Sequence, residues 1–309
     1  MRRAHPPPRR RQAGPGAGEE RGGLVLANYG RFLAVEGGDG TVVRCVARAR
    51  LRDVVCGDRV GWVPDGSGQG VVVSVAPRHG VLLRPDRRGR PRPVAANLDR
   101  VVVVVAPQPP FDRHLLDRYL AAAELCGIGA AVLVNKADLL DEAARADWRA
   151  RLAPYADMGY AVAFASTCTA SGIDALAALL AGRTSILVGQ SGVGKSSLVK
   201  ALLPDLPIRI GRLSEATGLG RHTTTATTLY HLPRGGDLID SPGVRAFALW
   251  TTEPREVARG FVDIARLAPA CRFADCRHLG EPGCAVEAAA ARGALDPERL
   301  ASYRRIVAG

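Results

Sequence analysis

The sequence predicts a multidomain α/β protein with an N-terminal OB-like β-barrel, a parallel α/β domain and a helical C-terminal domain. Three observations lead to this prediction. The chain has 309 residues, which is more than one compact domain usually contains. Short valine-rich runs come first, and buried strands that alternate with helices follow them. An alanine-rich helical region with clustered cysteines comes last.

The N-terminal region begins with a basic segment and continues as short strands. Residues 1–23 are mainly Pro, Arg and Gly, so we expect a disordered basic tail. The next residues form valine-rich runs at regular spacing, which favours a small all-β unit, and a five-stranded OB-like barrel fits its length. Residues 78–92 contain six arginines, which predict an exposed basic linker, so barrel and linker together span residues 24–92. The valine-rich runs are Thr41–Val46, Asp58–Val63 and Gly70–Val75.

Residues 93–250 have the pattern of a parallel α/β domain, because continuously apolar strands alternate with helical segments. Ligands of such sheets bind at the carboxyl ends of the strands. The expected strands are Val101–Ala106, Ala131–Val134, Ala161–Ala165, Ser185–Val188 and Gly236–Ile239. The expected helices are Asp112–Cys126, Asp141–Ala153, Ile173–Leu180 and Val193–Leu203.

The charge balance predicts a polyanionic partner. Lys plus Arg outnumber Asp plus Glu by 42 to 30, which gives a net charge of +12, and nucleic acid or an anionic membrane attracts such a chain. No apolar run reaches the roughly 18 residues of a membrane span, and no apolar segment follows the basic N-terminus, as a secretory signal requires. We therefore expect a cytoplasmic protein.

The strongest motif lies between an expected strand and an expected helix, and it matches G-x-x-x-x-G-K-[ST]. Its backbone N–H groups and the helix N-terminus attract phosphate. Lys195 would bridge the β- and γ-phosphates as a catalytic group, and Ser196 would bind Mg²⁺. The pattern predicts a nucleoside triphosphate site. Its residues are Gly189, Gln190, Ser191, Gly192, Val193, Gly194, Lys195, Ser196 and Ser197.

A second motif, N-K-x-D, follows the expected strand Ala131–Val134 and indicates that the base is guanine. The Asp138 carboxylate can accept the N1 and 2-amino hydrogens of guanine, which adenine does not offer together. Ser166 and Thr167 follow the next strand, where a Ser-Ala-Lys loop approaches guanine in GTPases, although Thr167 and Cys168 replace Ala and Lys. The motif residues are Asn135, Lys136, Ala137 and Asp138.

A third motif, D-x-x-G, places Asp240 and Gly243 after an expected strand. In GTPases this Asp holds Mg²⁺ through water and this Gly senses the γ-phosphate. The preceding threonine run offers Thr223 and Thr224 as Mg²⁺ ligands, and the pattern fits both. Because N-K-x-D and Ser166 precede the phosphate loop here, the domain is circularly permuted. Permutation places the switch segments beside the last domain, so we expect nucleotide to control the placement of that domain.

The C-terminal region, residues 251–309, contains a cluster of potential metal ligands. Three thiolates and one imidazole form a closed tetrahedral Cys₃His set, which is typical of structural zinc. A catalytic metal would require an open coordination position, so the sequence predicts one structural Zn²⁺. The ligands are Cys271, Cys276, His278 and Cys284.

Together these motifs resemble the ribosome small subunit-dependent GTPase A family (RsgA, also called YjeQ). The resemblance covers about residues 24–285 and does not account for residues 1–23. It implies GTP hydrolysis to GDP and phosphate with Mg²⁺, rRNA binding, and a role in late maturation of the 30S subunit. It also implies stimulation by that subunit and its 16S rRNA, with nucleotide state controlling release. We expect a monomer.

The catalytic water needs a group that the D-x-x-G motif does not supply. Val244 follows this motif, where many GTPases carry a Gln, and an apolar side chain cannot orient water. His222 in the threonine-rich segment is our candidate, and the resemblance suggests the same. His222 packing internally or contacting RNA is the competing interpretation. For the whole chain, the alternative is an RNA-binding zinc protein whose nucleotide site is mainly a regulatory switch.

Overall fold

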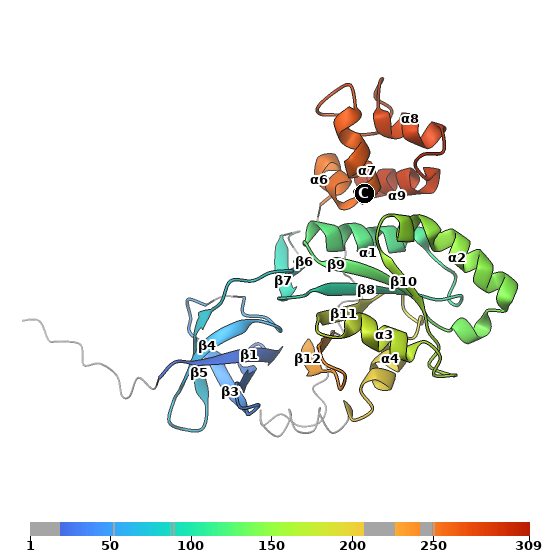
Figure 1. The fold of residues 1–309 in the computed structure, drawn as a ribbon. Coiled ribbons are helices and arrows are strands. Elements are labelled where there is room, and N and C mark those ends of the chain that lie inside the picture. Colours follow the sequence, from blue (N-terminus) through green and yellow to red (C-terminus); the bar gives the residue numbers. More distant parts are fainter. Residues whose placement is uncertain are drawn as a thin grey trace, which may run out of the picture.

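A computed structural model describes residues 19–51, 53–86, 88, 90–206, 226–241, 249 and 251–309. Three bodies follow one another along the chain, as Figure 1 shows. A barrel lies at one end, an α/β domain lies in the middle, and a cluster of helices packs on one face of that domain. This arrangement confirms the predicted fold class.

The first body is a five-stranded barrel, as predicted. Its strands are β1 (Arg21–Asn28), β2 (Leu33–Gly37), β3 (Val42–Ala47), β4 (Arg59–Pro64) and β5 (Gly70–Val75). The order β1-β2-β3-β5-β4, with a further pairing of β1 and β4, closes the barrel. Closure leaves the interior to side chains such as Val35, Trp62 and Val72, which are buried. Strand β1 begins inside the range 1–23 that was assigned to the tail.

The arginine-rich segment differs from the expected linker, because it forms a β-hairpin. Strands β6 (Leu82–Pro85) and β7 (Pro91–Ala95) pair antiparallel, with Arg84 opposite Arg92. The pattern analysis missed it because both strands contain proline. A two-stranded ribbon tolerates proline, since each strand has a free edge.

The middle body is the predicted α/β domain. Its strands are β8 (Arg100–Val105), β9 (Gly129–Val134), β10 (Ala161–Phe164), β11 (Thr184–Val188), β12 (Thr228–His231) and β13 (Asp237–Asp240). They lie in the order β10-β9-β8-β11-β13-β12, and only β12 is antiparallel to its neighbour in this domain. The valines of β8 are almost fully buried, because helices cover both faces of the sheet.

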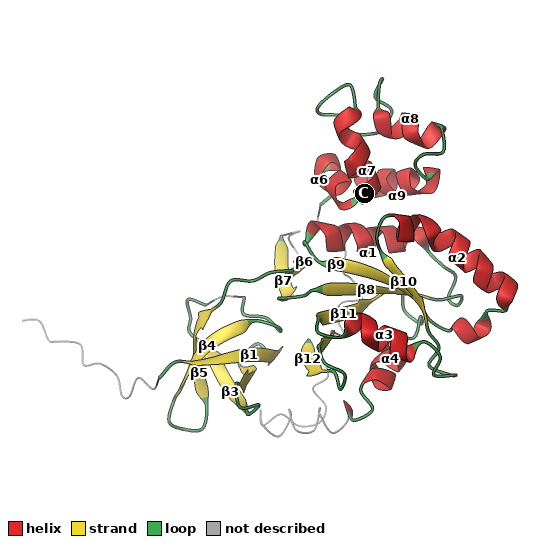
Figure 2. Ribbon diagram, in the orientation of Figure 1, coloured by secondary structure: helices red, strands yellow, loops and turns green. Residues whose placement is uncertain are grey.

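Helices cover both faces of this sheet (Figure 2). The helices α1 (Arg113–Leu125) and α2 (Glu142–Asp157) share one hydrophobic core, and α3 (Ile173–Leu180) and α4 (Lys195–Leu202) share the other. The side chains of Asp112 and Asp141 accept backbone hydrogen bonds at the starts of α1 and α2, and such N-caps fix where a helix begins. A 3₁₀ turn, η1, spans Ala137–Leu139.

The third body packs on α1. It comprises α6 (Pro254–Gly260), α7 (Val262–Leu267), the 3₁₀ turn η3 (Ala268–Ala270), α8 (Ala285–Ala291) and α9 (Pro297–Ala308). Ala121 of α1 belongs to the same core as Phe261 and Tyr303. The guanidinium of Arg299 on α9 lies 2.6 Å from the Asp117 carboxylate of α1, and both side chains are buried. The described docking surface of this domain is thus α1.

The barrel continues the sheet of the middle domain. Strand β12 pairs antiparallel with β1 through Thr228 and Ala27, so one eleven-stranded sheet runs through both bodies. Among the helices in the described ranges, none has the length and apolar character to cross a membrane.

Candidate nucleotide-binding site

The phosphate-loop motif joins the carboxyl end of β11 to α4, as the sequence predicted. The Lys195 ammonium donates hydrogen bonds to the carbonyl oxygens of Gly189 (2.6 Å) and Gln190 (2.7 Å). It therefore lies within the loop, whose backbone and helix N-terminus create a positive potential for phosphate.

Gly194 ends this loop in a conformation and a space that only glycine fits. Its φ is +95°, and a Cβ built there would lie 2.3 Å from Nδ2 of Asn135. An L-residue would be strained by the backbone angle and would collide with the amide. The close approach brings the second motif against the phosphate loop.

Asn135 connects these two motifs directly. Its Nδ2 donates a 2.8 Å hydrogen bond to the carbonyl oxygen of Val193, and the side chain is 1% exposed. The neighbouring Lys136 has φ of +58° and donates from Nζ to the Gln108 carbonyl at 2.9 Å. The phosphate loop and the N-K-x-D loop thus form one continuous rim at the carboxyl ends of β11 and β9.

The third predicted segment lies beside Asp138. The Ser166 hydroxyl donates a hydrogen bond to the Asp138 carboxylate, and Ser166 Oγ in turn accepts from the backbone N–H of Cys168 and Thr169 at 3.2 Å. Ser166 is buried and Asp138 is exposed. The hydroxyl therefore fixes a solvent-facing carboxylate, which is the geometry needed for reading a base. Thr167 is half-buried next to it.

Asp240 lies at the carboxyl end of β13, next to the strand that leads into the phosphate loop. Ile239 pairs with Ile186 of β11, which fixes this register. A carboxylate there lies at the same sheet edge as the phosphate loop, as a Mg²⁺ role requires. Ser196, the other described residue predicted to bind Mg²⁺, is exposed in the first turn of α4. The remaining predicted residues, His222, Thr223, Thr224 and Gly243, lie outside the described residues, as does Val244.

The four predicted metal ligands come together in the C-terminal domain. Their ligand atoms all lie within 4.8 Å of one another. The Cys271 and Cys284 sulfurs are 4.0 Å apart, and His278 Nδ1 is 3.4 Å from the latter sulfur. Zinc–sulfur bonds of about 2.3 Å in a tetrahedron place sulfurs about 3.8 Å apart, so the donor set fits this ion. The fourth ligand is Cys276.

The surroundings support a metal-binding role for this cluster. Burial lowers the pKa of His278, which keeps its imidazole neutral, the state that binds metal. Helix α9 holds the ligand loop in place, because the Arg304 guanidinium donates to the His278 carbonyl at 3.1 Å. The Tyr303 hydroxyl also donates to the Arg277 carbonyl at 2.7 Å.

The sequence alone indicates no role for His231 beyond a surface or packing residue. In the structure its ring bridges Asp237 of β13 (2.6 Å) and Glu36 of the barrel (2.8 Å), at the end of β12 away from Asp240. A signal was present in the sequence, since His231 and Asp237 flank a short turn between two strands. Nothing in the sequence around His231 indicated Glu36 as a second partner.

Comparison with known proteins agrees with this geometry. The family model described as RsgA GTPase matches residues 75–250. The chain is 49% identical to the small ribosomal subunit biogenesis GTPase RsgA of Marinobacter nauticus, over 94% of this chain and 84% of that protein. It is 50% identical to the protein of the same name from Chromohalobacter salexigens, over 94% of this chain and 87% of the relative.

Two crystal structures share the whole fold. YjeQ from Thermotoga maritima superposes with a TM-score of 0.77 at 31% identity, covering 94% of this chain and 98% of that one. YloQ, a circularly permuted GTPase, superposes with a TM-score of 0.73 at 28% identity, covering 94% of each chain.

The fold and the motif order define a circularly permuted P-loop GTPase that carries a β-barrel before its GTPase domain and a cysteine-containing helical domain after it. Such an enzyme hydrolyses GTP and uses Mg²⁺ with its nucleotide. The chain belongs to the RsgA GTPase family.

Proposed function

We propose that this GTPase acts in ribosome biogenesis, binds the 30S subunit through its 16S rRNA, and assists late maturation of that subunit. The observation that carries the proposal is near-full-length similarity, at about half identity, to proteins named small ribosomal subunit biogenesis GTPase. In this proposal the subunit stimulates hydrolysis of GTP to GDP and phosphate. The nucleotide state then controls release.

The proposed roles of the nucleotide-site residues rest on the sequence motifs and, for the described residues, on their contacts. Asp138 reads guanine with support from Ser166, and Asn135 holds the guanine loop against the phosphate loop. Lys195 would bind the phosphates. Ser196 would bind Mg²⁺ directly, and Asp240 would hold it through water. The backbone and side chains of Lys136, Ala137, Thr167 and the remaining phosphate-loop residues complete the nucleotide contacts, together with Gly243 and either Thr223 or Thr224.

His222 orients the attacking water in this proposal, since Val244 cannot. The His222→Ala variant is expected to lose subunit-stimulated hydrolysis while its GTP affinity changes little, because the guanine and phosphate loops are intact. Turnover and equilibrium nucleotide binding, measured side by side, check this. A variant that keeps the full stimulated rate would exclude His222 from the chemistry.

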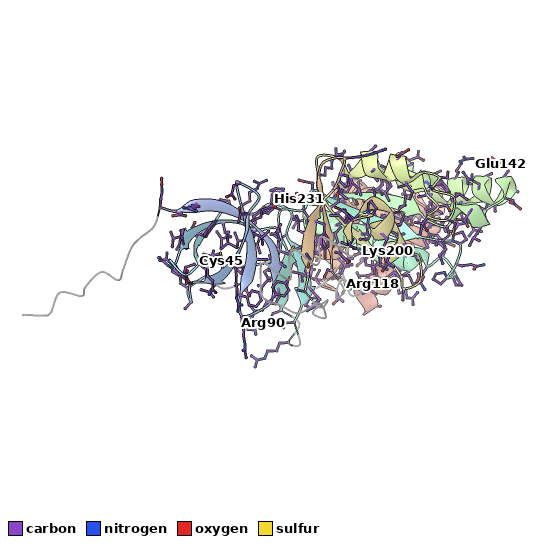
Figure 3. The ribbon with its side chains drawn as sticks, turned by 90° about the horizontal axis from the view of Figure 1, so that it is seen from below. Cys45, Arg90, Arg118, Glu142, Lys200 and His231 are labelled. Atoms are coloured by element: carbon purple, nitrogen blue, oxygen red, sulfur yellow. The ribbon has the colours of Figure 1, made fainter. Side chains whose placement is uncertain are left out.

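An RNA partner suits the charged surface of the described chain. The arginines of the β6–β7 hairpin are exposed, and Figure 3 shows Arg90 at its outer edge. Phosphate contacts release counterions, so binding should weaken steeply with added salt. The other described arginines of this hairpin are Arg84, Arg88 and Arg92.

We also propose that Cys271, Cys276, His278 and Cys284 hold one structural Zn²⁺, which crosslinks the loop between η3 and α8. Removal of Zn²⁺ by a strong chelator should unfold this loop and lower the thermal stability of the C-terminal domain, because binding and folding are coupled. Metal analysis of the purified protein is expected to give one Zn²⁺ per chain. Thiolate ligands require reduced cysteines, which supports a cytoplasmic location. In this proposal the protein works as a monomer.

The central experiment compares GTP hydrolysis by the protein alone, with 30S subunits and with 50S subunits. Stimulation by 30S and not by 50S is the expected result. The Lys195→Ala variant provides the control for contaminating hydrolases, since it removes the phosphate-binding ammonium. Equal rates in all three mixtures would leave a GTPase whose activator is not the small subunit.

A further inference from the structure

Barrel residues such as Leu26 and Ala34 share a hydrophobic core with Leu229 and Ile239 of the GTPase domain. Hydrogen bonds and an ion pair join the two described bodies at two places on this boundary. The first is the segment that enters β8, where the Asn97 side chain donates to the Gly57 carbonyl at 2.8 Å and the Ala96 N–H donates to the Cys56 carbonyl at 2.9 Å. Asn97 is buried, and β8 lies in the centre of the sheet. This contact ties the barrel to the segment that enters a central, buried strand of the sheet.

The second contact is on the β12–β13 hairpin. Its backbone part is the pairing of Thr228 with Ala27, at the end of β12 nearest Asp240. A side-chain contact lies at the other end of β12, where His231 Nε2 is 2.8 Å from the Glu36 carboxylate of β2. The barrel therefore holds both ends of β12.

His231 is suited to joining the two bodies because carboxylates from both flank its ring. Nδ1 lies 2.6 Å from Asp237 within the hairpin, and Nε2 faces Glu36 across the boundary. Charge-assisted hydrogen bonds on both nitrogens require the doubly protonated imidazolium. Figure 3 shows His231 at the junction of the barrel and the GTPase domain.

The position of this hairpin matters for the reaction because β13 ends at Asp240, the proposed Mg²⁺ residue. Asp240 pairs directly with Thr228, the residue that also meets the barrel. Any shift of β12 relative to the central strands must therefore act against a barrel that is already anchored at Asn97.

We propose that Glu36 and His231 are positioning residues, which hold the hairpin that carries Asp240 to the barrel and so couple the nucleotide site to whatever the barrel binds. The proposal rests on the proposed function for the identity of the barrel's partner, an RNA surface of the small subunit. The coupling is reciprocal, because a partner that favours one hairpin position changes nucleotide binding by the same factor as nucleotide changes partner binding.

The test compares the wild-type protein with Glu36→Gln, which keeps the size of the side chain and removes its charge. The matched control is Glu142→Gln, which breaks an exposed ion pair with Arg149 (3.5 Å) at the opposite end of the molecule (Figure 3). Hydrogen–deuterium exchange is measured with GDP and with a non-hydrolysable GTP analogue plus Mg²⁺. This readout needs no ribosomal subunit, so it is independent of the proposed function.

We expect the GTP analogue to change exchange in β1 and β2 of the wild type and of Glu142→Gln, and this response to disappear in Glu36→Gln. Subunit-stimulated turnover should fall about fivefold or more in Glu36→Gln, in the range typical of coupling between sites, while unstimulated turnover stays within about twofold. A wild-type barrel that does not respond to nucleotide, or a Glu36→Gln variant that behaves as Glu142→Gln does, would overturn the proposal.

A double-mutant cycle with His231→Gln separates coupling from general loosening. If the two side chains act through each other, Glu36→Gln has no further effect on the exchange response once His231 is replaced. Additive effects would show independent roles and reject the pair as the connection. Absence of 30S stimulation in the wild type, with the exchange response present, would refute the proposed partner and leave the coupling intact.

Discussion

At the scale of single residues, the site depends on one buried amide. Asn135 belongs to the motif that reads the base, yet its Nδ2 bonds to Val193 in the motif that holds the phosphates. Gly194 permits this contact, because any Cβ at that position would occupy the place of the amide nitrogen. A side chain of one motif therefore bonds to the backbone of the other, although 58 positions separate the bonded residues.

We predict that Asn135→Ala weakens GTP and GDP binding about tenfold or more and lowers the free energy of unfolding by about 1 to 3 kcal/mol. The reason is that the Val193 carbonyl would lose its partner in a buried place. Isothermal titration and urea denaturation measure the two effects. Lys200→Ala is the control, since this exposed lysine lies on α4 just beyond the loop. Unchanged nucleotide affinity in Asn135→Ala would mean that the loops are held by other contacts.

At the scale of elements, the C-terminal domain docks through a close helix contact. Gly260 at the end of α6 faces α1 so closely that an added Cβ would lie 2.7 Å from the Ala121 carbonyl oxygen and 3.1 Å from its Cβ. The Ala121 carbonyl oxygen belongs to helical backbone and the Ala121 Cβ is attached directly to it, so neither atom can move away without a shift of α1. The glycine sets the distance between the two helices.

Gly260→Ala should therefore destabilise the docked domain by about 1 to 3 kcal/mol, the usual cost of overpacking a tight contact. Thermal unfolding followed by circular dichroism measures the change. Gly38→Ala serves as the control, because a Cβ built at Gly38 meets nothing within 4 Å. Equal melting temperatures for both variants would show that α6 can shift away from α1 without loss.

At the scale of the whole molecule, buried charge holds the C-terminal domain on the GTPase domain. Arg299 is 1% exposed, pairs with Asp117 of α1 and with Asp263 of α7, and stacks over the Phe261 ring. The Tyr155 hydroxyl donates to the same Asp117 carboxylate. Among the described residues, these contacts hold the C-terminal domain on α1. The expectation that nucleotide controls the placement of this domain stays a prediction.

Arg299→Ala is predicted to lower the free energy of unfolding by about 3 to 5 kcal/mol, because it leaves the Asp117 carboxylate buried without its partner. Chemical denaturation monitored by tryptophan fluorescence checks this value. Arg305→Ala, an exposed position on the same helix, should change stability by less than about 0.5 kcal/mol. A loss at Arg299 no larger than at Arg305 would contradict a role for buried charge.

The contact between barrel and GTPase domain predicts a pH dependence. Hydrogen bonds to Asp237 and Glu36 raise the pKa of His231 to about 9, above the roughly 6.5 of an unfolded histidine. Its stabilising contribution is therefore full below about pH 6.5 and is lost as the pH rises through 9. The stability difference between wild type and His231→Gln should shrink over this range in urea titrations. A constant difference would show that His231 does not stabilise the fold through its charge.

Short motifs of consecutive residues were enough to predict the chemistry of the nucleotide site and of the cysteine cluster. Backbone shape or ligand type is specified locally by three patterns: the glycine spacing of Gly189–Ser196, the Asn135–Asp138 motif and the Cys₃His set. The order of the first two motifs also revealed the circular permutation. Most strands and helices of the α/β domain followed from apolar periodicity. The pattern did not locate β1, β2, β12 or the individual C-terminal helices, and proline hid the pairing of the β6–β7 hairpin.

Contacts between residues that are distant in the sequence became visible only in the folded chain. The His231–Glu36 pair joins positions 195 residues apart, and the Arg299–Asp117 pair joins positions 182 residues apart. No local pattern encodes such pairs, because in the sequence Glu36 and Asp117 look like carboxylates on an ordinary solvent-exposed surface. The fold places β12 beside the barrel and α9 on α1. Burial and short distance then strengthen the electrostatic attraction between the paired charges.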